Sequence, residues 1–298
     1  MSSRYADANG VFLNKLGITD AAELKAAEYA LTTRRLHELE EGRSTLKAEG
    51  FGLDRLKAIH GHLFQDVYGW AGQPRTVNSS KRASNGMTSV FEAPERIASS
   101  WEKLAEKTEA FVAGKGATIE QQREQLVAIY AEANRIHPFP EGNGRSLQTF
   151  MRHLAREQGL DLDYTRTNSR DWNLASAVSG TNGRLFEGQY LIPNQPDSEP
   201  IRKIFSEIVR PARALAFDHL PEAEASRKFP ELRGAYAGLR AIEDRAKASM
   251  SGDTERIAGY MHEVRSAFVK RLDEGKPLEP VRLQSVEPAK PREKDRER

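Results

Sequence analysis

The sequence predicts a mainly α-helical protein: a helical bundle with one small β-hairpin, followed by a helical extension and a disordered tail. Apolar residues recur with the 3.6-residue period of amphipathic helices along most of the chain. One stretch, residues 75–91, instead has two short extended segments around polar turn formers. From residue 275 the chain is rich in proline and in charges of both signs, a composition typical of disorder.

Length and composition indicate a globular protein and exclude several classes. The 298 residues, of which 38% are hydrophobic, are enough for a core. A formal net charge of +2 gives no indication of nucleic acid or an anionic membrane as a partner. The absence of cysteine excludes disulfides and thiolate metal sites. No signal peptide or membrane span is apparent, so we expect a cytoplasmic protein, with export by a signal-less secretion or conjugation route still open.

The first part of the chain is expected to form an irregular arm and then two helices. Residues 1–19 lack a helical period, whereas apolar residues recur at helical spacing over about 20–41 and 54–68. His60 and His62 lie in the second of these helices only two residues apart. They would face different sides of it, so we do not expect them to share a metal ion.

The extended stretch is predicted to be a hairpin of about residues 76–91, called the flap below. Strand-like residues stand at 76–77 and 88–91, with turn formers between them. A solvated surface loop is the alternative reading, and the motif further along the chain favours the hairpin. An exposed strand edge can bind an extended segment of another protein through main-chain hydrogen bonds.

Further helices are expected over 94–113, 118–136 and 169–178, and residues 180–200 read as a loop rich in Gly, Asn and Pro. Trp172 either lines a nucleotide pocket or fills the core, and the core is favoured. We therefore expect four segments. They are an arm (1–19), a main domain (20–215), a helical appendage of unknown role (216–274) and a charged, Pro-rich tail (275–298).

The most informative stretch is His-Pro-Phe-Pro-Glu-Gly-Asn-Gly-Arg at residues 137–145, which leads into an amphipathic helix. A helix start leaves N–H groups without partners and carries roughly half a positive charge, so it suits a phosphate. Gly142 and Gly144 permit positive φ and close approach of a ligand to the main chain. This loop is therefore expected to cradle an anion.

Charged side chains in the same stretch predict phosphate chemistry. Arg145 can bind a second phosphate with its planar fork, and Glu141 supplies a carboxylate of the kind that Mg²⁺ takes beside phosphate oxygens. His137 is the candidate base, because its unperturbed pKa of about 6.5 leaves much of it neutral at physiological pH.

These nine residues resemble the H-x-F-x-(D/E)-G-N-G-R signature of the Fic (filamentation-induced-by-cAMP) family, whose members mostly transfer AMP from ATP to a protein hydroxyl. Residues 59–81, with Trp70-Ala71-Gly72 among them, resemble the helix and strand that lead into the family's flap. The resemblance covers about residues 20–210. It implies a Fic-type helical bundle, a protein adenylyltransferase activity, ATP as the donor and Mg²⁺ as the cofactor.

The resemblance also implies a role for each residue of the motif. His137 would deprotonate a Tyr, Thr or Ser hydroxyl of the target, which attacks the α-phosphorus of ATP and releases pyrophosphate. Phe139 would anchor the loop, and Glu141 would bind Mg²⁺. Gly142, Asn143 and Gly144 would form the anion hole for the phosphates. Arg145 would contact the β-phosphate. The flap around Lys81 would cover the nucleotide and dock the target as an extended segment.

One position departs from the family pattern. Gln148 stands where a second arginine usually holds the γ-phosphate, and a neutral amide loses about 1–3 kcal/mol of such a charge-assisted contact. Arg152, one helical turn further, is a candidate to compensate. The departure leaves two alternatives open: a transferase with another donor such as UTP, and a nucleotide-binding interaction module without catalysis. The intact His137 favours catalysis.

Regulation is predicted from a second, weaker pattern. Many Fic proteins are inhibited by a helix with Ser/Thr-x-x-x-Glu-Gly/Asn, and Thr45, Glu49 and Gly50 fit it. Because Gln148 replaces the usual partner of such a glutamate, inhibition by a separate small antitoxin-like protein, or none, is favoured over inhibition by Glu49.

Overall fold

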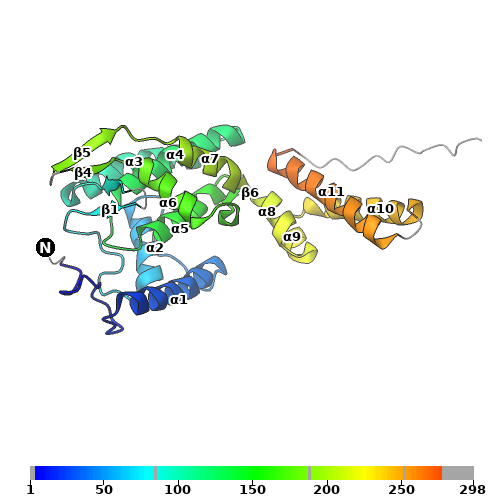
Figure 1. The fold of residues 1–298 in the computed structure, drawn as a ribbon. Coiled ribbons are helices and arrows are strands. Elements are labelled where there is room, and N and C mark those ends of the chain that lie inside the picture. The colour runs from blue at the N-terminus through cyan, green and yellow to red at the C-terminus, as the bar shows by residue number, and fades with distance from the viewer. Residues whose placement is uncertain (1–3, 84–85, 187–188, 251–252, 277–298) are drawn as a thin grey trace, which may run out of the picture. The chain divides into compact units, whose positions relative to one another are not determined.

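The computed structural model describes residues 4–83, 86–186, 189–250 and 253–276. It divides into two compact units, Met1–Leu215 and Ala216–Arg298. Both units are built mainly from helices (Figure 1), which confirms the predicted fold class. The predicted division into four segments stays a prediction.

The first unit is a bundle of helices around one core. Its α-helices are α1 (Ala21–Glu40), α2 (Leu53–Phe64), α3 (Ile97–Ala113), α4 (Ile119–Ile136), α5 (Asn143–Arg156), α6 (Ser169–Val178) and α7 (Glu199–Ile208). Short 3₁₀ helices cover Pro94–Arg96 and Tyr164–Arg166. Helix α5 packs against both α2 and α4, so the segment between α4 and α5 starts from the centre of the bundle.

Helices α4 and α5 are positioned by features that the sequence shows directly. A reciprocal capping box of Thr118 and Gln121 begins α4. The buried face of α5 repeats at helical spacing through Leu147, Phe150, Met151 and Leu154. The chain between the two helices, residues 137–142, is called the motif loop below.

Gly142 begins α5 in a conformation that only glycine fits. Its φ is 81°, in the left-handed region. A Cβ built there would stand 2.3 Å from Cζ of Phe64, whose ring on α2 is fully buried. The motif loop therefore enters α5 with its main chain pressed against an aromatic ring.

The flap is a hairpin of β1 (Ser80–Arg82) and β2 (Thr88–Val90), with Lys81 opposite Ser89. A hairpin is predicted here, but its first strand lies at Ser80–Arg82 and not at 76–77, because pairing with β2 orders residues that are expected in the turn. The prediction of a loop at 180–200 is wrong, because the strands β4 (Asn182–Phe186) and β5 (Gln189–Asn194) lie in this segment. They extend the flap to a four-stranded antiparallel sheet in the order β1-β2-β4-β5. The turn-forming residues of this segment locally favour a loop. Pairing of β4 with β2, which is distant in the sequence, makes the segment a strand instead.

A two-stranded sheet of β3 (Leu160–Leu162) and β6 (Val209–Pro211) closes the other end of this unit. The Ala212–His219 helix, α8, follows β6. The second unit contains α9 (Glu222–Lys228), α10 (Leu232–Ser249) and α11 (Thr254–Asp273).

Aromatic contacts hold the second unit together. Phe217 packs on Tyr236 with ring centroids 4.9 Å apart, and on Phe268 at 6.2 Å. Apart from Gly275 and Lys276, the predicted disordered tail lies outside the described residues.

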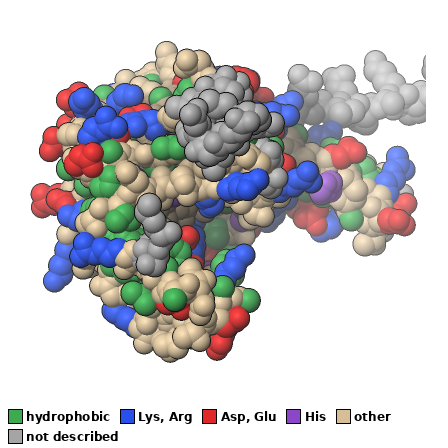
Figure 2. Space-filling model, turned by 60° about the vertical axis from the view of Figure 1, so that its left-hand side comes forward, with side chains coloured by type: hydrophobic (Ala, Val, Ile, Leu, Met, Phe, Trp, Pro, Cys, Tyr) green, Lys and Arg blue, Asp and Glu red, His purple; other side chains and the backbone are tan. Residues whose placement is uncertain are grey.

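Positive and negative side chains are interspersed on the face that Figure 2 shows, as the near-balanced composition predicts. Across the part of the chain that the structure describes, none of the helices combines the length and apolar character needed to cross a membrane.

Replacing Gly142 by alanine should lower the free energy of unfolding by about 3 kcal/mol, because left-handed strain adds to the clash with Phe64. Urea unfolding measures the change. The control is Gly144→Ala, since Gly144 is helical and a Cβ there meets nothing within 4 Å. That variant should keep or slightly raise the stability, and equal losses in both would contradict the prediction.

Candidate active site

A cavity of about 640 Å³ lies under the flap in the first unit. Its walls come from the N-terminal arm, the flap strand β1, the motif loop, the start of α5 and helix α6. The volume is within the range of small-molecule sites, about 300–1,000 Å³. It brings together five residues that the sequence predicts for one site: His137, Glu141, Asn143, Gly144 and Lys81.

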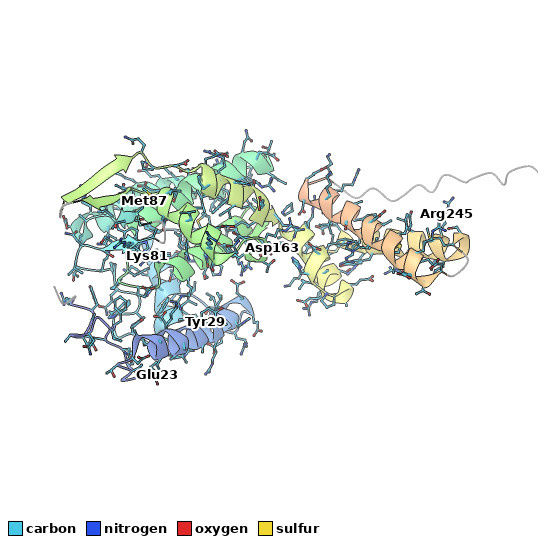
Figure 3. All side chains as sticks on the ribbon, viewed as in Figure 1. Glu23, Tyr29, Lys81, Met87, Asp163 and Arg245 are labelled. Atoms are coloured by element: carbon cyan, nitrogen blue, oxygen red, sulfur yellow. The ribbon has the colours of Figure 1, made fainter. Side chains whose placement is uncertain are left out.

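The charges around this cavity favour an anionic ligand. Among its described lining residues the permanent cations are Arg75, Lys81, Arg82 and Arg170, and the one acid is Glu141. Figure 3 shows Lys81 on the flap strand β1. Four cations around one carboxylate give the cavity a positive potential that suits phosphate groups.

His137 ends α4 and is held in an unusual conformation. It is the only non-glycine residue with positive φ in the described chain, at φ 49° and ψ 65°. Such a residue carries about 1–2 kcal/mol of strain. Its imidazole stacks on Phe91, directly after β2, with ring centroids 3.6 Å apart and planes 4° from parallel.

The imidazole of His137 is neutral over the physiological range. Burial, with the nearby cations Lys81 and Arg75, lowers its pKa to about 3. The side chain is half-buried and lines the cavity, so a ring nitrogen keeps a lone pair that can accept a proton there.

Phe139 and Asn143 lock the motif loop. Phe139 is fully buried and stacks on His60, with centroids 3.9 Å apart, as expected of an anchor. The Asn143 amide donates to the Phe139 carbonyl (2.7 Å) and accepts from its N–H (2.9 Å). Because the side chain of Asn143 is used in this brace, only its main chain is left to face an anion.

His60 supports the loop from α2. Its Nδ1 accepts from the N–H of Gly72 (2.8 Å), so Nε2 carries the proton and donates to the carbonyl of Glu141 (3.0 Å). Burial lowers its pKa to about 4. Both ring nitrogens therefore have hydrogen-bond partners within the protein.

Glu141 is placed so that it could bind a metal ion together with a phosphate-bearing substrate. Its carboxylate lines the cavity and accepts from the N–H of Gly142 (3.0 Å). No group of three acidic, histidine or cysteine side chains gathers anywhere in the described residues. A divalent cation at Glu141 would therefore take its remaining ligands from water and phosphate oxygens, which is the usual binding mode of Mg²⁺ in nucleotide sites.

Arg145 lies differently from the position that the motif suggests. Its side chain does not line the cavity but turns to α1. There it forms an ion pair with Glu28, donates to the Thr32 hydroxyl (2.8 Å) and covers the Phe64 ring at 4.7 Å. Glu28 also accepts a hydrogen bond from Tyr68.

Sequence reasoning missed Glu28. It is only 7% exposed and lies between Leu24 and Thr32 on the buried face of α1. The sequence did contain a signal for Glu28: it is an acid at a position where the helical period predicts an apolar residue. Burial, followed by the bond to Glu28, raises the pKa of Tyr68 well above its usual value.

Gln148 and Arg152 do not reach the cavity. The Gln148 carbonyl accepts from the Tyr164 hydroxyl (3.1 Å). Arg152 donates to the Leu162 carbonyl (3.0 Å) and pairs with Asp161 at 3.2 Å. The expectation that Arg152 compensates for the missing arginine therefore finds no support, because the neighbouring acid and carbonyl hold it elsewhere.

The predicted inhibitory pattern is not on a helix. Thr45 and Glu49 are exposed in the irregular segment between α1 and α2. Gly42 and Gly50, with φ of 70° and 62°, break the helical path on either side. Glu49 is therefore not placed as an inhibitory residue.

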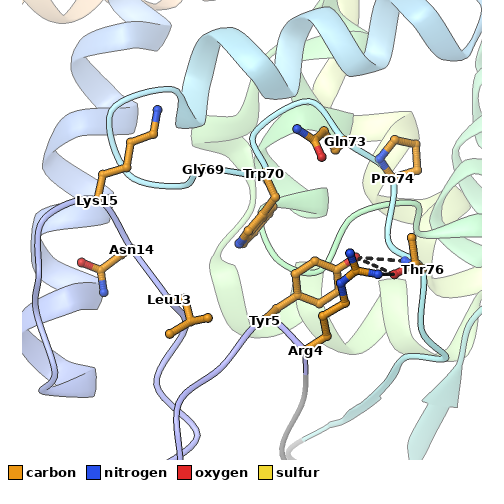
Figure 4. Close-up of a pocket in the computed structure, with 10 residues that line it drawn as sticks. All are labelled: Arg4, Tyr5, Leu13, Asn14, Lys15, Gly69, Trp70, Gln73, Pro74 and Thr76. Atoms are coloured by element: carbon orange, nitrogen blue, oxygen red, sulfur yellow. Dashed lines mark hydrogen bonds between the residues drawn. The ribbon is translucent and has the colours of Figure 1, made fainter.

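The N-terminal arm belongs to the site, which the sequence did not indicate. Tyr5 lines the main cavity and also a second hollow of about 450 Å³ beside Trp70 (Figure 4). Its hydroxyl accepts from the N–H of Thr76 (3.0 Å), so the arm is tied to the chain just before β1.

Trp172 both fills the core and reaches the cavity. It is 6% exposed and packs on Tyr130 and Phe205, as the favoured reading expects. It also belongs to the lining of the cavity, beside Asn173 of the same helix.

Replacing Glu28 by alanine should lower the free energy of unfolding by about 2–3 kcal/mol, because Arg145 and Tyr68 both lose a buried partner. Chemical denaturation measures the change. Glu23→Ala is the matched control on the same helix, where Glu23 is exposed (Figure 3), and it should change stability by less than about 1 kcal/mol. Indistinguishable variants would refute the buried network.

Comparisons with known proteins agree with the motif. VbhT of Bartonella schoenbuchensis, named a protein adenylyltransferase, is 35% identical over 170 residues. That match covers 57% of this chain and 34% of VbhT, so the chain spans about a third of that relative. The Salmonella typhimurium protein named Probable protein adenylyltransferase Fic is 30% identical over 68% of this chain and 90% of its own length.

The fold is likewise that of solved Fic domains. The N-terminal Fic domain of a Bartonella quintana protein, crystallised with bound ADP, superposes with a TM-score of 0.60 at 22% identity. It covers 72% of this chain and 98% of that domain. The Fic/DOC family model matches residues 50–155, from the start of α2 to the end of α5. The motif, the arrangement of the helices and the relatives together establish that this chain belongs to the Fic/DOC family.

Proposed function

We propose that this chain is a protein adenylyltransferase, which transfers AMP from ATP to a hydroxyl side chain of a target protein. The observation that carries the proposal is the imidazole of His137 in the lining of a cation-lined cavity at the N-terminus of α5. The names of the relatives support the same reaction. The matched family model includes the motif loop and the helices on either side of it.

In this reaction His137 acts as the general base. It takes the proton from a Tyr, Thr or Ser hydroxyl, and the freed oxygen forms a bond to the α-phosphorus of ATP. The bond from that phosphorus to the oxygen shared with the β-phosphate breaks, and pyrophosphate leaves with the electron pair. The stacked ring of Phe91 and the left-handed backbone of His137 keep the imidazole in one orientation.

The phosphates would lie at the start of α5. The main-chain N–H groups of Asn143 and Gly144 belong to its first turn, and the open space around Gly144 allows a phosphate to approach closely. Mg²⁺ bound by Glu141 would supply charge neutralisation between phosphate oxygens. Lys81 on the flap adds a cation to the lining of the same cavity.

The target would dock on the flap. Strand β1 is the terminal strand of its sheet, so one of its edges lies outside the ladder. Ser80, Lys81 and Arg82 are exposed there. An extended target segment could pair with this edge and present its hydroxyl to His137.

The test is incubation of the full chain with labelled ATP, UTP or GTP and a cell lysate as the source of targets. We expect transfer from ATP, and a loss of about 10²–10⁴-fold in the His137→Ala variant because the base is removed. Chelation of Mg²⁺ should also abolish transfer. His37→Ala, an exposed histidine of α1, is the matched control and should transfer normally.

Each other outcome selects another function. Transfer from UTP alone would identify a different donor, as Gln148 in place of the second arginine permits. Binding of nucleotide without transfer would identify an interaction module. Undiminished labelling by His137→Ala would rule out the assigned base.

A further inference from the structure

Arg75 is a buried cation whose ligands, within the described residues, are main-chain oxygens. It is 2% exposed. Its guanidinium donates to the carbonyls of His137 (2.9 Å), Val77 (2.9 Å) and Ile136 (3.2 Å), and to that of Glu92. A buried charge is costly unless hydrogen bonds compensate it, and here four carbonyls accept hydrogen bonds from one guanidinium.

These four carbonyls belong to two parts of the chain with different tasks. Ile136 and His137 end α4 and carry the candidate base, whereas Val77 and Glu92 stand just outside the two strands of the flap. The main-chain N–H of Arg75 also donates to the carbonyl of Pro138 (2.7 Å). One side chain therefore joins both ends of the flap to the motif loop.

The contacts of Arg75 and of the neighbouring flap residues constrain both the backbone and the ring of His137. The carbonyl of His137 belongs to a strained left-handed residue, and Arg75 Nε fixes its direction. Phe91, adjacent to Glu92, stacks on the imidazole. Glu92 is itself tied to the end of α4, because it pairs with Arg135 at 2.8 Å. A displacement of the flap base would displace the imidazole.

We infer that Arg75 is a positioning residue that holds the flap and His137 as one unit, so that a target segment bound along β1 is aligned with the base. This inference rests on the proposed function for its catalytic consequence. The mechanical coupling itself does not depend on which nucleotide or target is used. Arg75 is not assigned to the bond-making step, since its donors are engaged by the main chain.

Substitution by lysine separates the charge from the planar fork. Lysine keeps the cation but has a single ammonium group, which cannot reach carbonyls on two separate segments in the same way. Arg75→Lys should therefore keep only part of the hydrogen-exchange protection and of the kcat that Arg75→Met loses. The matched control is Arg55→Met. Like Arg75, Arg55 donates to a main-chain carbonyl, that of Ala48 (2.8 Å), but it does not line the cavity.

Hydrogen exchange of the full chain tests the coupling without any substrate. We expect Arg75→Met to speed exchange at least about tenfold in residues 77–92 and 136–142 together, with α3 and α7 unchanged, because only the segments joined by Arg75 are released. Acceleration in one of the two segments alone, or an equal change throughout the chain, would overturn the inference. Arg55→Met should leave both segments as in the wild type.

Steady-state transfer tests the catalytic consequence. We expect Arg75→Met to lower kcat about 100-fold with a change in KM for ATP below about threefold, and Arg75→Lys to lie between it and the wild type. Normal kcat in Arg75→Met, or a change confined to KM for ATP, would overturn the positioning role. If the wild type transfers no nucleotide, the proposed function fails, and the exchange result decides the coupling separately.

Discussion

The site depends on one short reversal of the chain between α4 and α5. The main chain is left-handed at His137 and again at Gly142, and the Asn143 amide closes the turn by bonding both main-chain groups of Phe139. With these restraints, the candidate base at the end of one helix and the N-terminus of the next, which is suited to an anion, lie in the same cavity. The fully buried rings of Phe64 and Phe139 resist any relaxation of this turn.

The sequence predicted the parts of the site that are local. The motif loop, the amphipathic α5 and the flap hairpin each follow from neighbouring residues, and the structure contains all three. Strands β4 and β5 were missed because their order depends on pairing with β2, almost a hundred residues earlier in the chain. The partners of Arg145 and Arg152 were missed for the same reason, since Glu28 and Asp161 meet them only in the folded bundle.

The ion pair between the buried Glu28 and the half-buried Arg145 affects the proposed phosphate site. A guanidinium that already has a carboxylate, a hydroxyl and an aromatic face as partners gives up these contacts to reach a phosphate. Under the proposed function, the β-phosphate therefore competes with Glu28 for Arg145. The intact pair also braces α1 against α5, so the same contact serves stability and limits the charge available to the nucleotide.

This competition gives the flap a second task under the proposed function. With Arg145 engaged, Gln148 neutral and Arg152 held by Asp161, the cations that do line the cavity are on α6, on β1 and just before β1. Lys81 lies on the strand where a target would dock, and Arg75 joins that strand to His137. Seating a target segment would thus set three things at once: the acceptor hydroxyl, the base and a cation for the departing phosphates. Selectivity for a docked protein over water as the acceptor follows from this arrangement, because the groups that assist the reaction are aligned by the flap to which the protein binds.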